Sequence, residues 1–225
     1  MQDVIAYFST HGADYIQMVL EHLNVSVLSL AVAILVAVPL GIACSRSPLL
    51  EKISVGVSGI LRIIPSLAVL VVCVPILGTG VLPAVVALTV LAIPPILINT
   101  ALGFRSVPDD VLEVARGMGM DERLVFFKIK VPLAFPVSFA GIRTAASEVV
   151  ASATLAAYIG AGGLGQIIFT GLGLMRTDLL VIGGASVAAL SLLVGMLLSA
   201  IDRRMRPYEF AKQQMQASAR HVKSS

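Results

Sequence analysis

The chain has 225 residues, of which 57% are hydrophobic and only 13% are charged, and its net charge at pH 7 is +3. A soluble domain of this size needs a polar face on most of its helices, and the long apolar runs of this sequence have none. The composition therefore excludes a soluble globular protein and predicts an all-α integral membrane protein.

Five apolar stretches are long enough to cross a membrane, because a hydrocarbon core about 30 Å thick takes roughly 20 helical residues. We interpret residues 1–23, which precede them, as a short helix on the outer face. Arg62 falls inside the second stretch, where its long side chain can still extend to the membrane surface. The five predicted spans are 24–44, 55–76, 82–103, 132–158 and 179–201.

Lys and Arg residues gather on alternate sides of these spans. The turn at 45–53, the segment 104–131 and the tail 202–225 are basic, whereas residues 1–23 contain no Lys or Arg. Cytoplasmic loops carry an excess of Lys and Arg, so the sequence predicts an outer N-terminus and a cytoplasmic C-terminus. This topology accounts for the basic residues without a nucleic-acid partner. The lack of basic residues at the N-terminus also argues against a cleaved signal peptide, and the tail beyond Pro207 is expected to be partly disordered.

Segment 104–131 holds ten of the 29 charged residues of the chain, and its local pattern predicts helix–turn–helix. Ser106 is expected to cap the first helix, and Gly119 to take the left-handed conformation that ends it. Asp121 can cap a second short helix, and Pro132 is suited to the first turn of the fourth span.

Several apolar side chains of this segment are expected to be exposed and to form a docking surface. A loop that merely joins two spans is the alternative, but loops of this length without a function are uncommon. The apolar residues in question are Val111, Leu112, Val114, Leu124 and Phe127.

The same segment resembles the "EAA" loop of prokaryotic ABC-importer permeases. The pattern of that loop is E-A-A, three residues, G, nine residues, I, one residue, L-P. Val114 and Val131 replace its Ala and Leu. The residues that match, with every spacing kept, are Glu113, Ala115, Gly119, Ile129 and Pro132.

Four further stretches resemble the osmoprotectant permeases, which import glycine betaine, carnitine, choline and related compounds. They are "IPSLAVLVVCVPILGTGVLPAVVAL" (64–88), "GIRTA" (141–145), "ATLAAYIGAGGLGQIIFTGL" (153–172) and "RTDLL" (176–180). The resemblance covers roughly residues 20–200 and implies a type I ABC-importer permease in the bacterial inner membrane. Residues 24–201 would then form the permease domain.

The resemblance also implies the partners of the chain. Segment 104–131 would couple to a cytoplasmic ABC ATPase, present in two copies, beside a second permease, identical or paralogous, and an extracytoplasmic substrate-binding protein. The chain itself has no G-x-x-x-x-G-K-[ST] loop, so it is expected to bind no cofactor and to catalyse no reaction, while the ATPase uses ATP and Mg²⁺. The expected coupling residues are Asp109, Glu113, Ala115, Arg116, Gly119, Leu124, Ile129 and Pro132.

Polar residues inside the spans are candidates for a transport pathway, because polar groups in a bilayer must be satisfied or face a cavity. The alternative for each hydroxyl group is a hydrogen bond within its own helix or between helices. The candidates are Ser66, Asn99, Thr144, Ser147, Glu148 and Thr154, with Thr100 and Ser152 as further possibilities.

Glu148 is the unusual member of this set, since an acid near a helix centre costs about 2.5–3.5 kcal/mol on insertion scales. Arg143 lies five positions earlier, about 140° round the helix, and is a poor partner. Glu148 is therefore expected to pair with another subunit, to face water or to attract a cationic substrate. It also supports an alternative function, a secondary carrier or channel driven by an ion gradient, and a structural membrane subunit is a third.

The sequence predicts no metal site, because its three histidines are scattered and no ligand cluster occurs. The glycine-rich stretch 159–171 is interpreted as a tight outer turn with a short helix. With no Trp and only four Tyr, the chain is not expected to form a tight aromatic cage for a quaternary ammonium ion. Substrate selection would then fall to the separate binding protein.

Overall fold

The computed structural model describes residues 2–205, so the tail predicted beyond Pro207 lies outside the described part. Within residues 2–205 the elements are all helical. A π-helical turn, Phe126–Lys130, and a 3₁₀ turn, Ala157–Ile159, flank α7. The α-helices are α1 Gln2–Ser45, α2 Pro48–Ile63, α3 Ser66–Leu77, α4 Val81–Arg105, α5 Asp109–Gly117, α6 Glu122–Val125, α7 Val131–Ala156, α8 Gly165–Gly173 and α9 Thr177–Met205.

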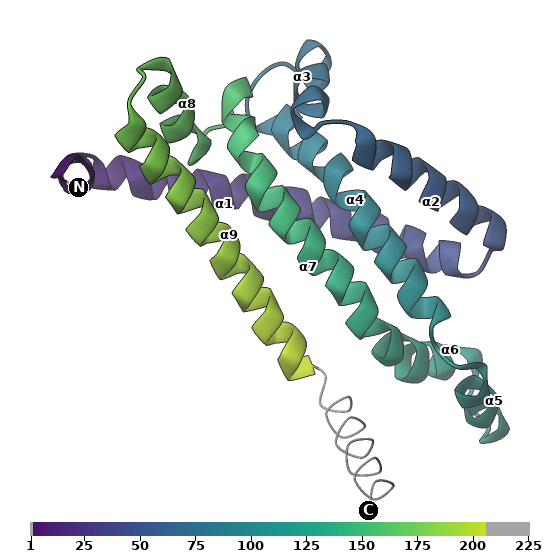
Figure 1. The fold of residues 1–225 in the computed structure, drawn as a ribbon. Helices are drawn as coiled ribbons and strands as arrows, with labels where there is room; N and C mark the ends of the chain where they lie inside the picture. Colours follow the sequence, from purple (N-terminus) through teal and green to yellow (C-terminus); the bar gives the residue numbers. More distant parts are fainter. Residues whose placement is uncertain (1, 206–225) are drawn as a thin grey trace, which may run out of the picture.

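Helix α4 forms the centre of the arrangement, with α1 and α7 packed against it (Figure 1). Helix α9 packs against α7, and α8 lies at one end of that pair. The short helices α5 and α6 lie at the opposite end of α7 (Figure 1). The charged segment and the glycine-rich stretch are therefore at opposite ends of the molecule.

Four helical segments of the described chain are long and apolar enough to cross a membrane, namely Tyr7–Ser45, Val81–Arg105, Glu122–Ile159 and Thr177–Arg204. The second predicted span, 55–76, is wrong as a single helix, because α2 and α3 meet at an angle of 93°. Pro65 explains the break, since proline has no N–H and disfavours the helical conformation of the residue before it. Ile64 is accordingly extended, with φ −72° and ψ 123°. Counted as one bent span, α2 and α3 bring the total to five.

Helix α1 also differs from the prediction at its start. The outer helix expected over 1–23 and the span expected over 24–44 form one helix, Gln2–Ser45, interrupted only at His11. The apolar run continues across residue 23 without a helix-breaking residue, so the chain has no reason to end a helix there.

Small residues allow α1, α4 and α7 to pack closely. A Cβ atom at Gly41 of α1 would lie 2.7 Å from the Thr100 Cβ of α4. A Cβ atom at Gly141 of α7 would lie 2.5 Å from the Pro95 carbonyl oxygen of α4. Close backbone approach at small residues is the usual way in which membrane helices associate. The core between these helices is accordingly rich in buried alanine, including Ala33, Ala37, Ala84, Ala87, Ala92, Ala145 and Ala153.

The glycine-rich stretch forms a tight turn and a short helix, α8, as predicted. The turn is tied to α1, because the Gly163 N–H donates a hydrogen bond of 3.0 Å to the Glu21 carboxylate. The imidazole Nε2 of the buried His22 lies 2.9 Å from the Val150 carbonyl oxygen of α7. Two adjacent residues of α1 therefore fix this end of the molecule.

Candidate functional site

The charged segment forms two helical elements joined by a defined turn. Gly119 has φ +84°, so its predicted left-handed conformation is confirmed. The Gly119 N–H donates to the Arg116 carbonyl and the Met120 N–H donates to the Ala115 carbonyl, which is the Schellman pattern of hydrogen bonds at a helix end. The predicted cap at Asp121 is also confirmed, because its Oδ1 accepts a hydrogen bond of 2.7 Å from the Leu124 N–H.

The predicted role of Ser106 as a helix cap is wrong. Ser106 directly follows α4, and its hydroxyl group donates to the Gly103 carbonyl at 2.9 Å. Pro108 occupies the cap position of α5 in an extended conformation, with no side-chain hydrogen bond. The α4 helix continues as far as Arg105, which leaves Ser106 at its end. Only the acids Asp109 and Asp110 then favour the start of α5, through their negative charge.

The second short helix is not separate from the fourth span. Helix α6 continues through the π turn into α7, so one apolar helical segment runs from Glu122 to Ile159. The Val131 N–H bonds to the Phe126 carbonyl, five residues back. Proline clashes with the carbonyl four residues before it in a regular α-helix, and the wider π turn lies directly before Pro132. The helix therefore passes through Pro132 instead of beginning there.

A small buried cluster holds α5 against the start of α7. Ala115 is buried in it and Ile129 is partly buried, so these two motif residues support the segment from inside. Leu112 is also buried, with 6% of its surface exposed, and its predicted exposure is wrong. The buried members of the cluster are Val107, Leu112, Ala115, Val125 and Ala134.

The outer surface of this segment combines exposed charges with exposed apolar side chains. Asp109, Glu113 and Arg116 are exposed on α5. Arg116 Nε donates a hydrogen bond of 2.8 Å to the Glu122 carboxylate, which raises the pKa of the guanidinium above its usual range and ties α5 to α6. The exposed apolar residues are Val111, Val114, Met118, Leu124 and Phe127, of which only Met118 was absent from the sequence prediction.

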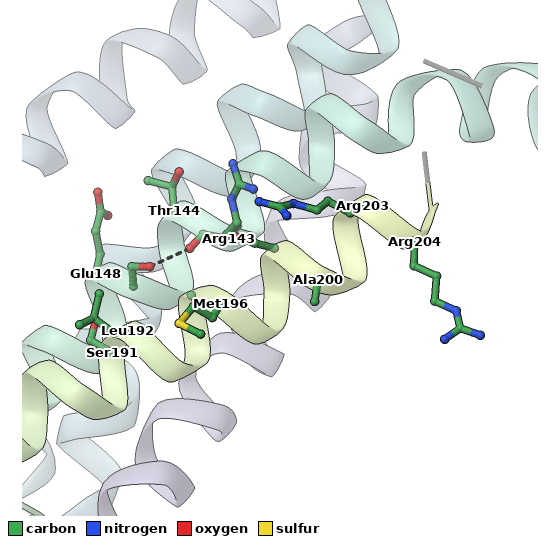
Figure 2. A pocket seen from close by; sticks show the side chains of 12 residues that line it. Arg143, Thr144, Glu148, Ser191, Leu192, Met196, Ala200, Arg203 and Arg204 are labelled. Atoms are coloured by element: carbon green, nitrogen blue, oxygen red, sulfur yellow. Dashed lines mark hydrogen bonds between the residues drawn. The ribbon is translucent and has the colours of Figure 1, made fainter. Parts of the chain in front are cut away.

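A second candidate site is a groove between α7 and α9, with a volume of about 1110 Å³ (Figure 2). Three predicted pathway residues, Thr144, Ser147 and Glu148, lie in its wall. The hydroxyl groups of Thr144 and Ser147 donate to the carbonyls of Ala140 and Arg143 within their own helix. Their hydroxyl oxygens can still accept hydrogen bonds from the groove.

The other predicted pathway residues do not line the groove. Ser66 is the first residue of α3, and the Asn99 side-chain amide donates to the Pro95 carbonyl at 2.8 Å. The Thr154 and Thr100 hydroxyl oxygens are buried without a hydrogen-bond partner. Ser152 is partly buried in α7. The structure thus brings together half of the six residues that the sequence singled out.

Two ion pairs connect the groove to neighbouring helices. The Arg62 guanidinium lies 3.4 Å from the Glu148 carboxylate, so Glu148 has a partner in its own chain and not necessarily in another subunit. Arg62 therefore does not simply extend to the membrane surface, as predicted. Arg143 lies 3.3 Å from the buried Asp202 of α9 and, as expected, does not pair with Glu148.

The α9 wall of the groove was missed at the sequence level. Its polar and small residues recur every fourth position, which places them on one face of a helix. This spacing is the signal that could have identified them. The α9 residues of the wall are Ser191, Leu192, Gly195, Met196, Ser199, Ala200, Arg203 and Arg204.

Residues 33–207 match the family described as "Binding-protein-dependent transport system inner membrane component". The carnitine transport permease protein OpuCB of Listeria monocytogenes is 41% identical over 207 residues, covering 92% of this chain and 95% of that protein. The choline transport system permease protein OpuBB of Bacillus subtilis is 36% identical with the same coverage. The glycine betaine/proline betaine permease protein ProW of Escherichia coli is 33% identical, covering 79% of this chain and 50% of that protein.

Solved structures show the same fold. A chain of the MetNI methionine ABC transporter in an inward-facing conformation has a TM-score of 0.73 at 23% identity, with 84% of this chain and 95% of that chain covered. A chain of an amino acid ABC transporter with histidines has a TM-score of 0.68 at 16% identity, with 88% and 97% covered. The likeness therefore extends through nearly the whole helical arrangement, and it favours an importer permease over a secondary carrier or a purely structural subunit.

Proposed function

Because the chain belongs to the family of binding-protein-dependent transport system inner membrane components, we propose that it is the permease of an ATP-driven importer for quaternary ammonium osmoprotectants such as glycine betaine, carnitine or choline. The observation that carries the substrate class is the similarity to permeases named for carnitine and choline over 92% of the chain. The family itself makes the chain a multi-pass membrane protein. The orientation proposed from its Lys and Arg residues has the N-terminus outside and the C-terminus in the cytoplasm.

The segment from α5 to the start of α7 is the proposed coupling element. Helix α5 presents Asp109 and Glu113 to a cytoplasmic ABC ATPase. Leu112 and Ala115 on its other face pack in the buried cluster with Ala134 of α7. Because closely packed cores transmit displacement instead of absorbing it, a movement of α5 driven by the ATPase is passed to the base of α7.

The motif residues divide into two roles in this proposal. Glu113, Arg116, Leu124 and the turn at Gly119 form the face toward the ATPase, whereas Ala115, Ile129 and Pro132 hold that face on α7. The ATPase, in two copies, binds ATP and Mg²⁺ and supplies the hydrolysis. This chain supplies the docking surface and binds no nucleotide.

The groove between α7 and α9 is the proposed half of the translocation pathway. A second permease, identical or paralogous, would face this groove and complete the pathway. The Glu148 carboxylate and the hydroxyl groups of Thr144 and Ser147 would then offer polar contacts to a passing substrate with an ammonium group. None of the residues that line the groove in the described chain is aromatic. Since aromatic cages hold quaternary ammonium ions tightly, selection is assigned to an extracytoplasmic binding protein.

The test is uptake of radiolabelled glycine betaine, carnitine and choline into proteoliposomes that hold the complete transporter. Uptake should require ATP and the binding protein, and Glu113→Lys should abolish it and reduce the ATPase recovered with the purified permease. Lys52→Glu is the matched control, because Lys52 is an exposed charge of α2 outside the coupling element. Uptake that persisted without ATP and collapsed with an uncoupler would instead establish a secondary carrier.

A further inference from the structure

A cavity of about 470 Å³ lies where α1 ends and the fourth span begins. Arg46 directly follows α1, and Lys130 directly precedes α7. We propose that this cavity binds the phosphate group of an anionic phospholipid such as phosphatidylglycerol. The residues that line it are Arg46, Glu122, Arg123, Phe126, Phe127 and Lys130.

The cations of the cavity differ from most other arginines of the described chain in having no carboxylate partner. Within residues 2–205, no ion pair involves Arg46, Arg123 or Lys130. The one carboxylate of the cavity, Glu122, is hydrogen-bonded to Arg116 outside it. By contrast, five arginines each pair with an acid, namely Arg62, Arg105, Arg116, Arg143 and Arg176. The cavity therefore has an excess of positive charge that an anion can neutralise.

An aromatic contact positions Arg46 while leaving its hydrogen-bond donors available. The guanidinium carbon of Arg46 lies 5.9 Å from the centre of the Phe126 ring. The Phe126 ring in turn stacks on Phe104, with 5.7 Å between the ring centres. A cation–π contact uses the face of the guanidinium, so its N–H groups stay free for the paired hydrogen bonds that arginine makes to phosphate.

The apolar side of the cavity suits a lipid better than a free ion. The Phe127 ring is perpendicular to the Phe126 ring, with 5.0 Å between centres, and 66% of its surface is exposed. An exposed phenyl ring beside basic groups at a span end can contact the first acyl carbons while the cations contact the phosphate. Basic pockets at the cytoplasmic ends of membrane helices are known to bind anionic head groups in this way.

A general topological bias and an ATPase contact each account for less of the cavity than a lipid does. Basic residues are expected on the cytoplasmic side of any membrane protein, which accounts for exposed residues such as Lys52 and Lys128 but not for three cations that converge on one cavity. The ATPase is a second candidate occupant. However, no residue of the cavity belongs to the motif of the coupling segment, and two of its cations stand at the ends of membrane spans.

The test is native mass spectrometry of the purified full-length permease with added phosphatidylglycerol or phosphatidylcholine. The unaltered chain should retain phosphatidylglycerol in preference to phosphatidylcholine. Arg46→Gln with Arg123→Gln should weaken phosphatidylglycerol binding about 25-fold, since a basic group near an anionic surface contributes roughly fivefold. Lys52→Gln with Lys128→Gln removes the same charge outside the cavity and should leave binding within about twofold of the unaltered chain, because these groups do not converge on one site.

Four outcomes would overturn the proposal. Equal losses in the two double variants would indicate general surface charge, and displacement of the lipid by inorganic phosphate at equal concentration would indicate a site for the free ion. Unchanged lipid binding with loss of the ATPase in the cavity variant would assign the cavity to the ATPase interface. Arg46→Lys keeps the charge and should retain most of the binding, so a complete loss in that variant with an unchanged melting temperature would also contradict it. None of these measurements depends on transport, so the result stands apart from the proposed function.

Discussion

The Arg62 guanidinium at the end of α2 lies 3.4 Å from the Glu148 carboxylate of α7, although 86 positions separate the two residues. The pair joins the bent second span to the wall of the groove. The two side chains are 54% and 42% exposed in the single chain. Ionisable groups of a membrane protein belong at a partner or a water-filled cavity, and here Glu148 has both.

We expect the two residues of this pair to depend on each other. Glu148→Gln and Arg62→Gln should each slow ATP-dependent uptake, because each leaves the opposite charge unpaired beside the pathway. The double variant should recover part of the loss. The coupling free energy should be about 0.5–1 kcal/mol, near the lower end for contacting residues because the pair is half exposed.

Initial rates of uptake in proteoliposomes, measured for the two single variants and the double variant, give this coupling energy. Losses that simply add would show that the two residues act independently. Unchanged uptake after Glu148→Gln would remove Glu148 from the pathway and leave it a structural role.

The turn at Gly119 should be sensitive to a single methyl group. Gly119 has φ +84°, where an L-residue costs roughly 1–2 kcal/mol. A Cβ atom added at Gly119 or at Gly117 would meet no atom within 4 Å. Gly119→Ala should therefore act through the backbone alone and lower the amount of ATPase recovered with the permease.

Gly117→Ala is the matched control, because Gly117 lies in α5 and alanine stabilises a helix by about 0.5–1 kcal/mol relative to glycine. The Gly117 variant should retain the ATPase fully. Equal behaviour of the two variants in the pull-down would refute the role of the left-handed turn.

The contact between α4 and α7 should not tolerate a side chain at Gly141. A Cβ atom there would lie 2.5 Å from the Pro95 carbonyl oxygen and 2.6 Å from the Asn99 Cβ. Overpacking of this kind costs about 1–3 kcal/mol, so Gly141→Ala should lower the melting temperature of the detergent-solubilised permease. Gly184→Ala in α9 meets no atom within 4 Å and should leave it nearly unchanged. A melting temperature unaffected by the change at Gly141 would mean that the helices separate easily.

The cap at Asp121 should hold the start of α6. Asp121→Ala removes the acceptor for the Leu124 N–H and should cost about 0.5–2 kcal/mol locally, whereas Asp121→Asn keeps an acceptor oxygen and should cost much less. Hydrogen–deuterium exchange measures this directly as faster exchange across Glu122–Val125 in the alanine variant. Equal exchange in the two variants would show that the buried cluster, and not the cap, fixes the helix.

Local features of the coupling segment could be predicted because they depend on neighbouring residues. Gly119 and Asp121 form a turn and a cap whose hydrogen bonds span only a few positions. The prediction for Leu112 failed for the opposite reason. Its burial depends on Val125 and Ala134, which return to it from the other side of the turn, and the local pattern of α5 does not contain that contact.

The sequence by itself determined the membrane class of the chain, the number of its apolar stretches, the position of the charged segment and the family resemblance, because hydropathy, charge and motif spacing are properties of the chain in one dimension. Only the tertiary structure decided how α2 leaves α3 at 93°, which three polar residues share a groove with α9, and that Arg62 meets Glu148. These relationships depend on the directions that helices take after Pro65 and on the small residues at which they pack. No window of neighbouring residues records either of them.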